Sequence, residues 1–196
     1  MLKIKDRIVL GIIAGLSGNL VKMGIDELWM RIKIPKRSFR ETAAGAWVWN
    51  RGEARSLKGQ AFGLILDSWM ASLGGIGAVY MLSKTGKDQL LPKGLMFGIS
   101  IGSFLTAALS ALPANKVPPR GATSNLSNLV SHAAYGVVTT YIAAALGDPS
   151  LYDAGPVNDY DYSGRQEANT ERIESMRHTR RNGAAPKTHN RHFGPH

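Results

Sequence analysis

Long apolar runs alternate with short basic segments along the first three quarters of the chain. Four stretches are strongly apolar, at about residues 7–27, 61–82, 94–112 and 126–146. About 20 residues of α-helix cross the hydrocarbon core of a bilayer, and each stretch is close to that length. Because a lipid-embedded helix satisfies its own backbone hydrogen bonds, the pattern predicts four membrane-spanning helices.

The first apolar run is more polar toward its end than a plain membrane anchor. It reads IVLGIIAGLSGNLVKMGIDELWM from residue 8, and its last turns carry Asn19, Lys22, Asp26 and Glu27. Lys22 and Asp26 are four residues apart, so they are neighbours on one helix face. We therefore expect a polar or charged side chain from another span to interact with these groups.

A basic connector follows, with eight lysine and arginine residues in residues 31–60. Ser38 and Glu41 have the spacing of a helix-capping box, and Trp47 and Trp49 follow the short helix that the box starts. Indole rings favour the interface between membrane and water. We expect an interfacial helix between the first two spans.

Glycines recur at helix-packing intervals in two spans. Gly11 and Gly15 form a GxxxG pair in the first, and Gly94, Gly98 and Gly102 recur every four residues in the third. Faces of small residues let helix backbones approach closely in lipid. The partner of each face is either another span of this chain or a second copy in a homo-oligomer.

The composition changes after residue 147. Residues 148–196 contain few aliphatic side chains, which predicts a disordered polar tail after a membrane domain of residues 1–147. The tail carries four histidines at spacings that fix no metal geometry, so we expect no metal site there: His178, His189, His192 and His196.

The net charge of +10 belongs entirely to the membrane domain, where 17 Lys/Arg stand against 7 Asp/Glu. These charges punctuate the apolar runs, as expected of loops that contact anionic lipid headgroups, and no nucleic-acid partner is expected. The chain has no cysteine, which excludes disulfides and thiol catalysis. No catalytic or cofactor motif is present, so we expect a non-enzymatic protein without a cofactor.

Helix direction brings three titratable residues to a similar depth. Asp67 and His132 are each the seventh residue of their predicted span, about 9 Å below the same surface by the helical rise. Lys22 lies near the end of the first span, which returns to that surface. One interpretation is an internal Lys22–Asp67–His132 cluster that lines a polar cavity, with Asn19 and Asp26 adjacent. The other is purely structural: Lys22 extends toward the interface and pairs with Asp67.

Short motifs in residues 7–146 resemble the YagU-type family of uncharacterised bacterial inner-membrane proteins. They are GIIAG at residues 11–15, VK at 21–22 and PKRS at 35–38, followed by the glycine-rich third span, the proline-rich turn and the histidine-bearing fourth span. The resemblance implies a small multi-span protein without an established activity, loosely tied to acid tolerance. Lys22 and His132 match the family's titratable positions.

The sequence thus predicts an all-α, multi-pass protein of the bacterial inner membrane, a four-span transmembrane helix bundle with an interfacial helix and a disordered C-terminal tail. Its function is expected to be that of an envelope or stress factor acting through partners. The alternative is a small transporter or proton-linked channel built around Lys22, Asp67 and His132.

Overall fold

The computed structural model describes residues 3–35, 37–119 and 121–152, together with residues 170, 173, 174, 176 and 177. The chain forms two units, Met1–Ala154 and Gly155–His196. The five described residues of the second unit are helical and exposed. The rest of the tail predicted to be disordered after residue 152 lies outside the described residues.

Four long helices confirm the predicted all-α architecture. They are α1 (Arg7–Arg31), α4 (Leu57–Thr85), α5 (Leu90–Ala111) and α6 (Ala122–Leu146). Each is long and apolar enough to cross a membrane. Most of them extend beyond the apolar runs, because polar residues at the ends of the spans continue the helices into the interface.

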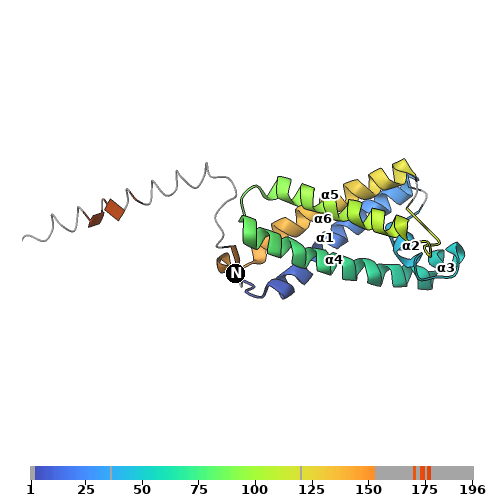
Figure 1. Ribbon diagram of the computed structural model, residues 1–196, viewed down its shortest axis with the longest axis horizontal. Coiled ribbons are helices and arrows are strands. Elements are labelled where there is room, and N and C mark those ends of the chain that lie inside the picture. The colour runs from blue at the N-terminus through green and yellow to red at the C-terminus, as the bar shows by residue number, and fades with distance from the viewer. Residues whose placement is uncertain are drawn as a thin grey trace, which may run out of the picture. The chain divides into compact units, whose positions relative to one another are not determined.

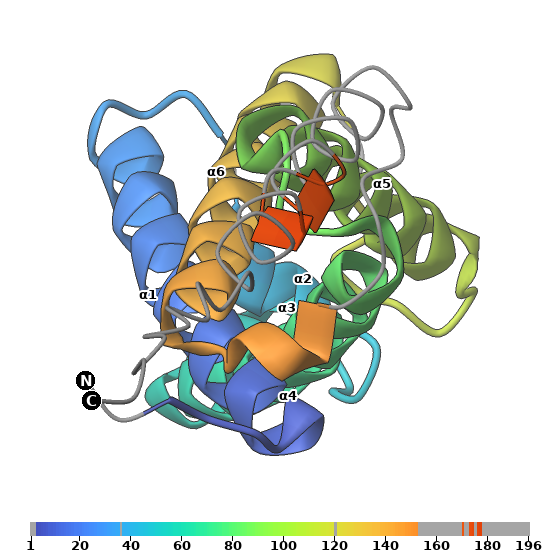
Figure 2. The ribbon, with the colours of Figure 1, turned by 90° about the vertical axis from the view of Figure 1, so that its left-hand side faces the viewer.

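The four long helices run lengthwise through the first unit (Figure 1). Helix α6 packs against both α1 and α5, and α1 also packs against α4, whereas α4 and α5 meet only sparsely. The view along the bundle shows α6 between α1 and α5 (Figure 2). Helix α6 is therefore the element through which α5 joins the others.

Glycine permits the close approach of α1 to α4. A Cβ atom on Gly11 would lie 2.7 Å from the backbone nitrogen of Ile76, and one on Gly15 would overlap the carbonyl oxygen of Ala71. Gly75 meets Gly15 from the opposite helix, so both backbones contribute to the contact. The GxxxG pair of the first span therefore packs against α4 of the same chain.

The glycines of α5 meet α6 in the same way. A Cβ on Gly94 would lie 2.7 Å from the Cα of Val137, and one on Gly98 would overlap the carbonyl oxygen of His132. A Cβ on Gly102 would lie 2.7 Å from that of His132. Of the two partners that the sequence left open, the structure shows another span of the same chain.

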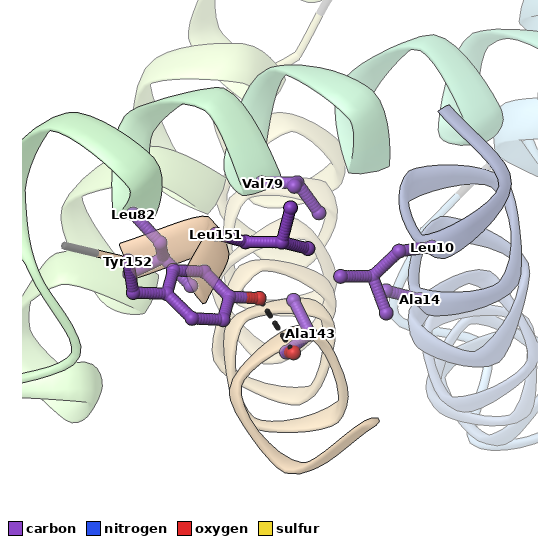
Figure 3. Close-up of a cluster of buried hydrophobic side chains, with 7 residues drawn as sticks. All are labelled: Leu10, Ala14, Val79, Leu82, Ala143, Leu151 and Tyr152. Carbon is purple, nitrogen blue, oxygen red and sulfur yellow. Dashed lines mark hydrogen bonds between the residues drawn. The ribbon is translucent and has the colours of Figure 1, made fainter. Parts of the chain in front are cut away.

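An apolar cluster closes the end of the bundle where α1 begins. Leu10, Val79 and Leu82 are fully buried there, and the 3₁₀-helix η1 (Pro149–Tyr152) packs onto them (Figure 3). The Tyr152 hydroxyl donates a 2.8 Å hydrogen bond to the Ala143 carbonyl. Burial raises the pKa of Tyr152 to about 12, which keeps this donor protonated. The membrane unit thus extends beyond the predicted boundary at residue 147, because Leu151 and Tyr152 supply apolar surface to its core.

The connector forms two short helices at the opposite end, α2 (Phe39–Ala44) and α3 (Arg51–Arg55). As expected from the capping box, the Ser38 hydroxyl accepts a hydrogen bond from the Glu41 backbone N–H at 3.1 Å. The Glu41 side chain instead pairs with Arg55 at 3.3 Å. Helix α2 packs against α4 with most of its residues buried, whereas Trp47 and Trp49 are exposed. The connector thus places a buried helix over the bundle and leaves two indoles for the interface.

Asn115, in the turn between α5 and α6, holds α2 in place. Its side-chain amide donates to the Thr42 carbonyl at 3.3 Å, and the Lys116 N–H donates to the Gly45 carbonyl at 2.8 Å. Asn115 is 6% exposed, so these bonds are shielded from water. The α5–α6 turn and the connector form one closed end of the bundle.

Replacing Gly98 by alanine tests the α5–α6 contact. The added methyl would overlap the backbone of α6, which cannot move as a side-chain tip can, and we expect a loss of about 1–3 kcal/mol in unfolding free energy. Gly24→Ala is the control, since nothing lies within 4 Å of its Cβ, and helix propensity favours alanine by up to about 1 kcal/mol. Unfolding in detergent measures both, and equal stabilities of the two variants would contradict the contact.

Candidate functional site

The charged site centres on an ion pair between α1 and α4. Lys22 Nζ donates to both carboxylate oxygens of Asp67, at 2.7 and 2.9 Å. The two residues are only 2% and 3% exposed. Because both side chains are almost fully buried, each charge must be compensated chiefly by the other.

A second carboxylate faces the same lysine. Asp26 lies one helical turn beyond Lys22, with 3.8 Å between Lys22 Nζ and Asp26 Oδ2. The Asp26 side chain is 16% exposed and lies near Ser131 of α6, whose hydroxyl donates to the Ser127 carbonyl at 3.1 Å. One buried lysine is therefore shared by two carboxylates, and the one on its own helix is held less closely.

An aromatic ring from the connector covers this lysine. Lys22 Nζ lies 4.6 Å from the centre of the Phe39 ring, which is within the range of a cation–π contact. The edge of the same ring system meets His132, with 5.1 Å between ring centres and planes at 74°. Phe39, the first residue of α2, thus contacts both Lys22 and His132 from the connector side.

His132 lies in α6, where its Nδ1 is 2.9 Å from the Asn128 carbonyl oxygen. A carbonyl only accepts, so Nδ1 carries the hydrogen and Nε2 of the neutral ring remains an acceptor. A cavity of about 10 Å³ lies between Lys22, Asp67 and His132, with Tyr135 on its wall. That is about the space of one water molecule.

Of the five residues predicted for the polar cluster, four converge. Lys22, Asp26 and Asp67 interact directly, and His132 shares the small cavity with Lys22 and Asp67. Asn19 is buried on the same helix, but its amide donates to Met23 Sδ at 3.7 Å and its Oδ1 has no partner among the described residues. It lies beside the cluster without bonding to it.

Phe39 and Tyr135 were not among the residues predicted for the cluster. Phe39 belongs to the connector, and only the burial of α2 brings it over Lys22. Tyr135 is 2% exposed, and its hydroxyl donates to the Ala71 carbonyl at 2.7 Å. Its position three residues after His132, on the same face of α6, is the one pattern that points to it.

A second cavity, of about 30 Å³, lies on the connector side of Asp26. Side chains of α1, α2 and α6 form its walls, and Arg37 of the connector reaches it. Burial lowers the pKa of the Arg37 guanidinium, and the neighbouring Arg51 lowers it further. Arginine stays charged despite such shifts, so this cavity has a cation at its connector side.

Removing one member of the ion pair tests its contribution to stability. Asp67→Leu leaves Lys22 with the more distant Asp26, and we expect a loss of about 3–5 kcal/mol in unfolding free energy. The double variant Lys22→Met/Asp67→Leu removes both charges and should recover most of that loss, because apolar pairs of similar volume replace buried ion pairs well. Unfolding in detergent compares them, and a double variant no more stable than the single one would contradict a compensated buried pair.

No family model, no curated protein and no solved structure matches the chain.

Proposed function

We propose that the protein is a multi-span membrane protein of the bacterial inner membrane that binds a proton at the Lys22–Asp26–Asp67 cluster. Through this protonation it acts as an acid-responsive envelope factor on partner proteins. The observation that carries the proposal is the charge of the cluster. One buried lysine faces the buried carboxylate of Asp67 on α4 and the partly buried carboxylate of Asp26 on α1.

With all three groups ionised, the cluster has a net charge of −1. An uncompensated charge within a membrane span costs about 2.5–3.5 kcal/mol on insertion scales. Arg40 is the next cation; it lies outside the cluster, 3.8 Å from Glu27, which also pairs with Arg31 at 3.2 Å. Binding one proton makes the buried cluster neutral.

Asp26 is the carboxylate that accepts this proton. Asp67 receives two short hydrogen bonds from Lys22, which protonation would weaken, whereas Asp26 lies 3.8 Å from the same nitrogen. The neutral Asp26 carboxyl would still be a hydrogen-bonding group beside Ser131. The proton therefore binds to Asp26, because its interaction with Lys22 is the weaker of the two.

The apolar end of the bundle supports a sensing role over transport through the chain. Leu10, Ala14 and Val79 are fully buried there, together with Leu82 and Ala143. An apolar core of this kind stays dry and offers no relay for a proton. The resemblance to YagU-type proteins, with their tie to acid tolerance, agrees with a response to acid from one side.

The alternative is a proton-linked transporter or channel built around Lys22, Asp67 and His132. It is favoured by the 10 Å³ cavity that these residues share, since Nε2 of His132 is an acceptor beside the ion pair. Proton flux into liposomes that is lost in Asp67→Asn would support this alternative. If the flux does not exceed that of empty liposomes, transport is excluded and the sensing role is retained.

Infrared difference spectra on acidification test the proton's location. The wild type should gain the carbonyl band of one protonated carboxyl group, and Asp26→Asn should lose that band. Lys22→Met should show the band already at neutral pH, because two carboxylates then face each other without a cation.

Glu27→Gln is the matched control for that experiment. Glu27 follows Asp26 directly, but its side chain is 50% exposed and pairs with Arg31 at the surface. Its replacement should leave the band unchanged. An acid band that persists in Asp26→Asn, or that no variant shows, would overturn the proposal.

A further inference from the structure

Two residues that line the cavity beside Asp26 carry buried polar atoms without hydrogen-bond partners among the described residues. Trp29 Nε1 and Asn128 Oδ1 both face away from solvent and have no hydrogen-bond partner among the described residues. Both side chains line the 30 Å³ cavity on the connector side of Asp26. One of these atoms can only donate a hydrogen bond and the other can only accept one.

Water satisfies both atoms, because a water molecule donates and accepts. A buried water needs about 10–15 Å³ and two to four polar partners, so a cavity of this volume holds about two of them. A small cation would leave the Trp29 N–H unsatisfied and would meet the charge of Arg37. An anion would meet the Asp26 carboxylate. The donor–acceptor pair thus selects a neutral hydrogen-bonding molecule.

The residues that line the cavity show which parts of the protein it connects. Asp26 and Phe39 lie on its wall toward the ion pair, and Pro35 and Arg37 lie on its wall in the connector. Arg37 is half-buried, so the cavity reaches residues in contact with water. Beyond Asp26, Phe39 covers Lys22, and α6 continues into fully buried positions such as Thr139.

We propose that this cavity is a hydrated access route from the connector end of the bundle to Asp26, and that it ends there. The inference rests on the proposed function only for what travels along the route. A hydronium ion gives up one proton to the Asp26 carboxylate, which becomes a neutral carboxyl group, and a water molecule remains. Four groups face Asp26 from the elements packed against it, or from its own helix, and they set the charge that the proton meets: Lys22 of α1, Asp67 of α4, Arg40 of α2 and Ser131 of α6.

The absence of cysteine from the chain allows a direct test with single thiols. Ser127 lines the cavity and is 7% exposed, and Ser127→Cys changes one atom. Thr139→Cys is the matched control, because Thr139 is also in α6, is fully buried and lines neither of the two cavities described above. Each full-length variant is treated with Ag⁺ in liposomes or detergent. It is then unfolded, and its remaining free thiols are counted with a maleimide.

The Ser127→Cys thiol should be blocked by Ag⁺, whereas the Thr139→Cys thiol should stay free. Equal reaction of both thiols, or protection of Ser127→Cys, would overturn the route. Should Ser127→Cys fail to fold, Ser38→Cys reports on the same cavity from α2's N-cap.

The infrared experiment separates the failure of this route from the failure of the proposed function. If the Ser127→Cys thiol is protected from Ag⁺ but the Asp26 band appears on acidification, the proton-binding function is supported and the access route is overturned. A blocked thiol without that band would support a hydrated cavity and overturn the proton-binding function. If the Ser127→Cys thiol is blocked and the Asp26 band is present, both proposals are supported. Asn128→Leu, which removes the acceptor, should then slow the appearance of the Asp26 band after a pH jump without changing its final amplitude.

Discussion

The compensation of charge inside an apolar helix bundle is the constraint on which the rest of this structure depends. Lys22 and Asp67 are almost fully buried on helices long and apolar enough to cross a membrane, so neither is tolerated without the other. Their contact requires α1 and α4 to approach closely, and the glycines at that contact make the approach possible. Phe39 then covers the lysine, which explains why part of the basic connector is buried rather than laid on the surface.

The same charges create an imbalance that packing does not remove. Asp26 adds a second carboxylate 3.8 Å from the lysine, and the nearby Arg40 lies outside the cluster, beside Glu27. A structural ion pair needs one carboxylate, so the second is the feature that suggests a function. The two ends of the bundle differ accordingly: polar side chains and cavities at the connector end, and an apolar cluster closed by η1 at the other.

Hydrophobic patterning was sufficient to predict the four helices. Helical rise was sufficient to place Lys22, Asp67 and His132 at a similar depth, which made an internal cluster one of two interpretations. Both follow from periodicities that the covalent chain imposes. The role of Phe39 could not be predicted, because it depends on how deeply the six-residue helix α2 of the connector enters the bundle. Asn115 illustrates the same limit, since it bonds to a residue 73 positions away and no local pattern reports such a contact. The packing of Leu151 and Tyr152 was missed because two apolar residues in a polar tail form no periodic pattern.

The central claim is that the folded bundle holds one more carboxylate than its buried lysine can compensate. Potentiometric titration of the purified protein in detergent tests it most directly, by counting the protons bound on acidification. The account predicts that the wild type binds one more proton than Asp26→Asn and that Glu27→Gln shows no such loss within the pH range where the cluster titrates. Equal proton binding by the wild type and Asp26→Asn over that range would contradict it.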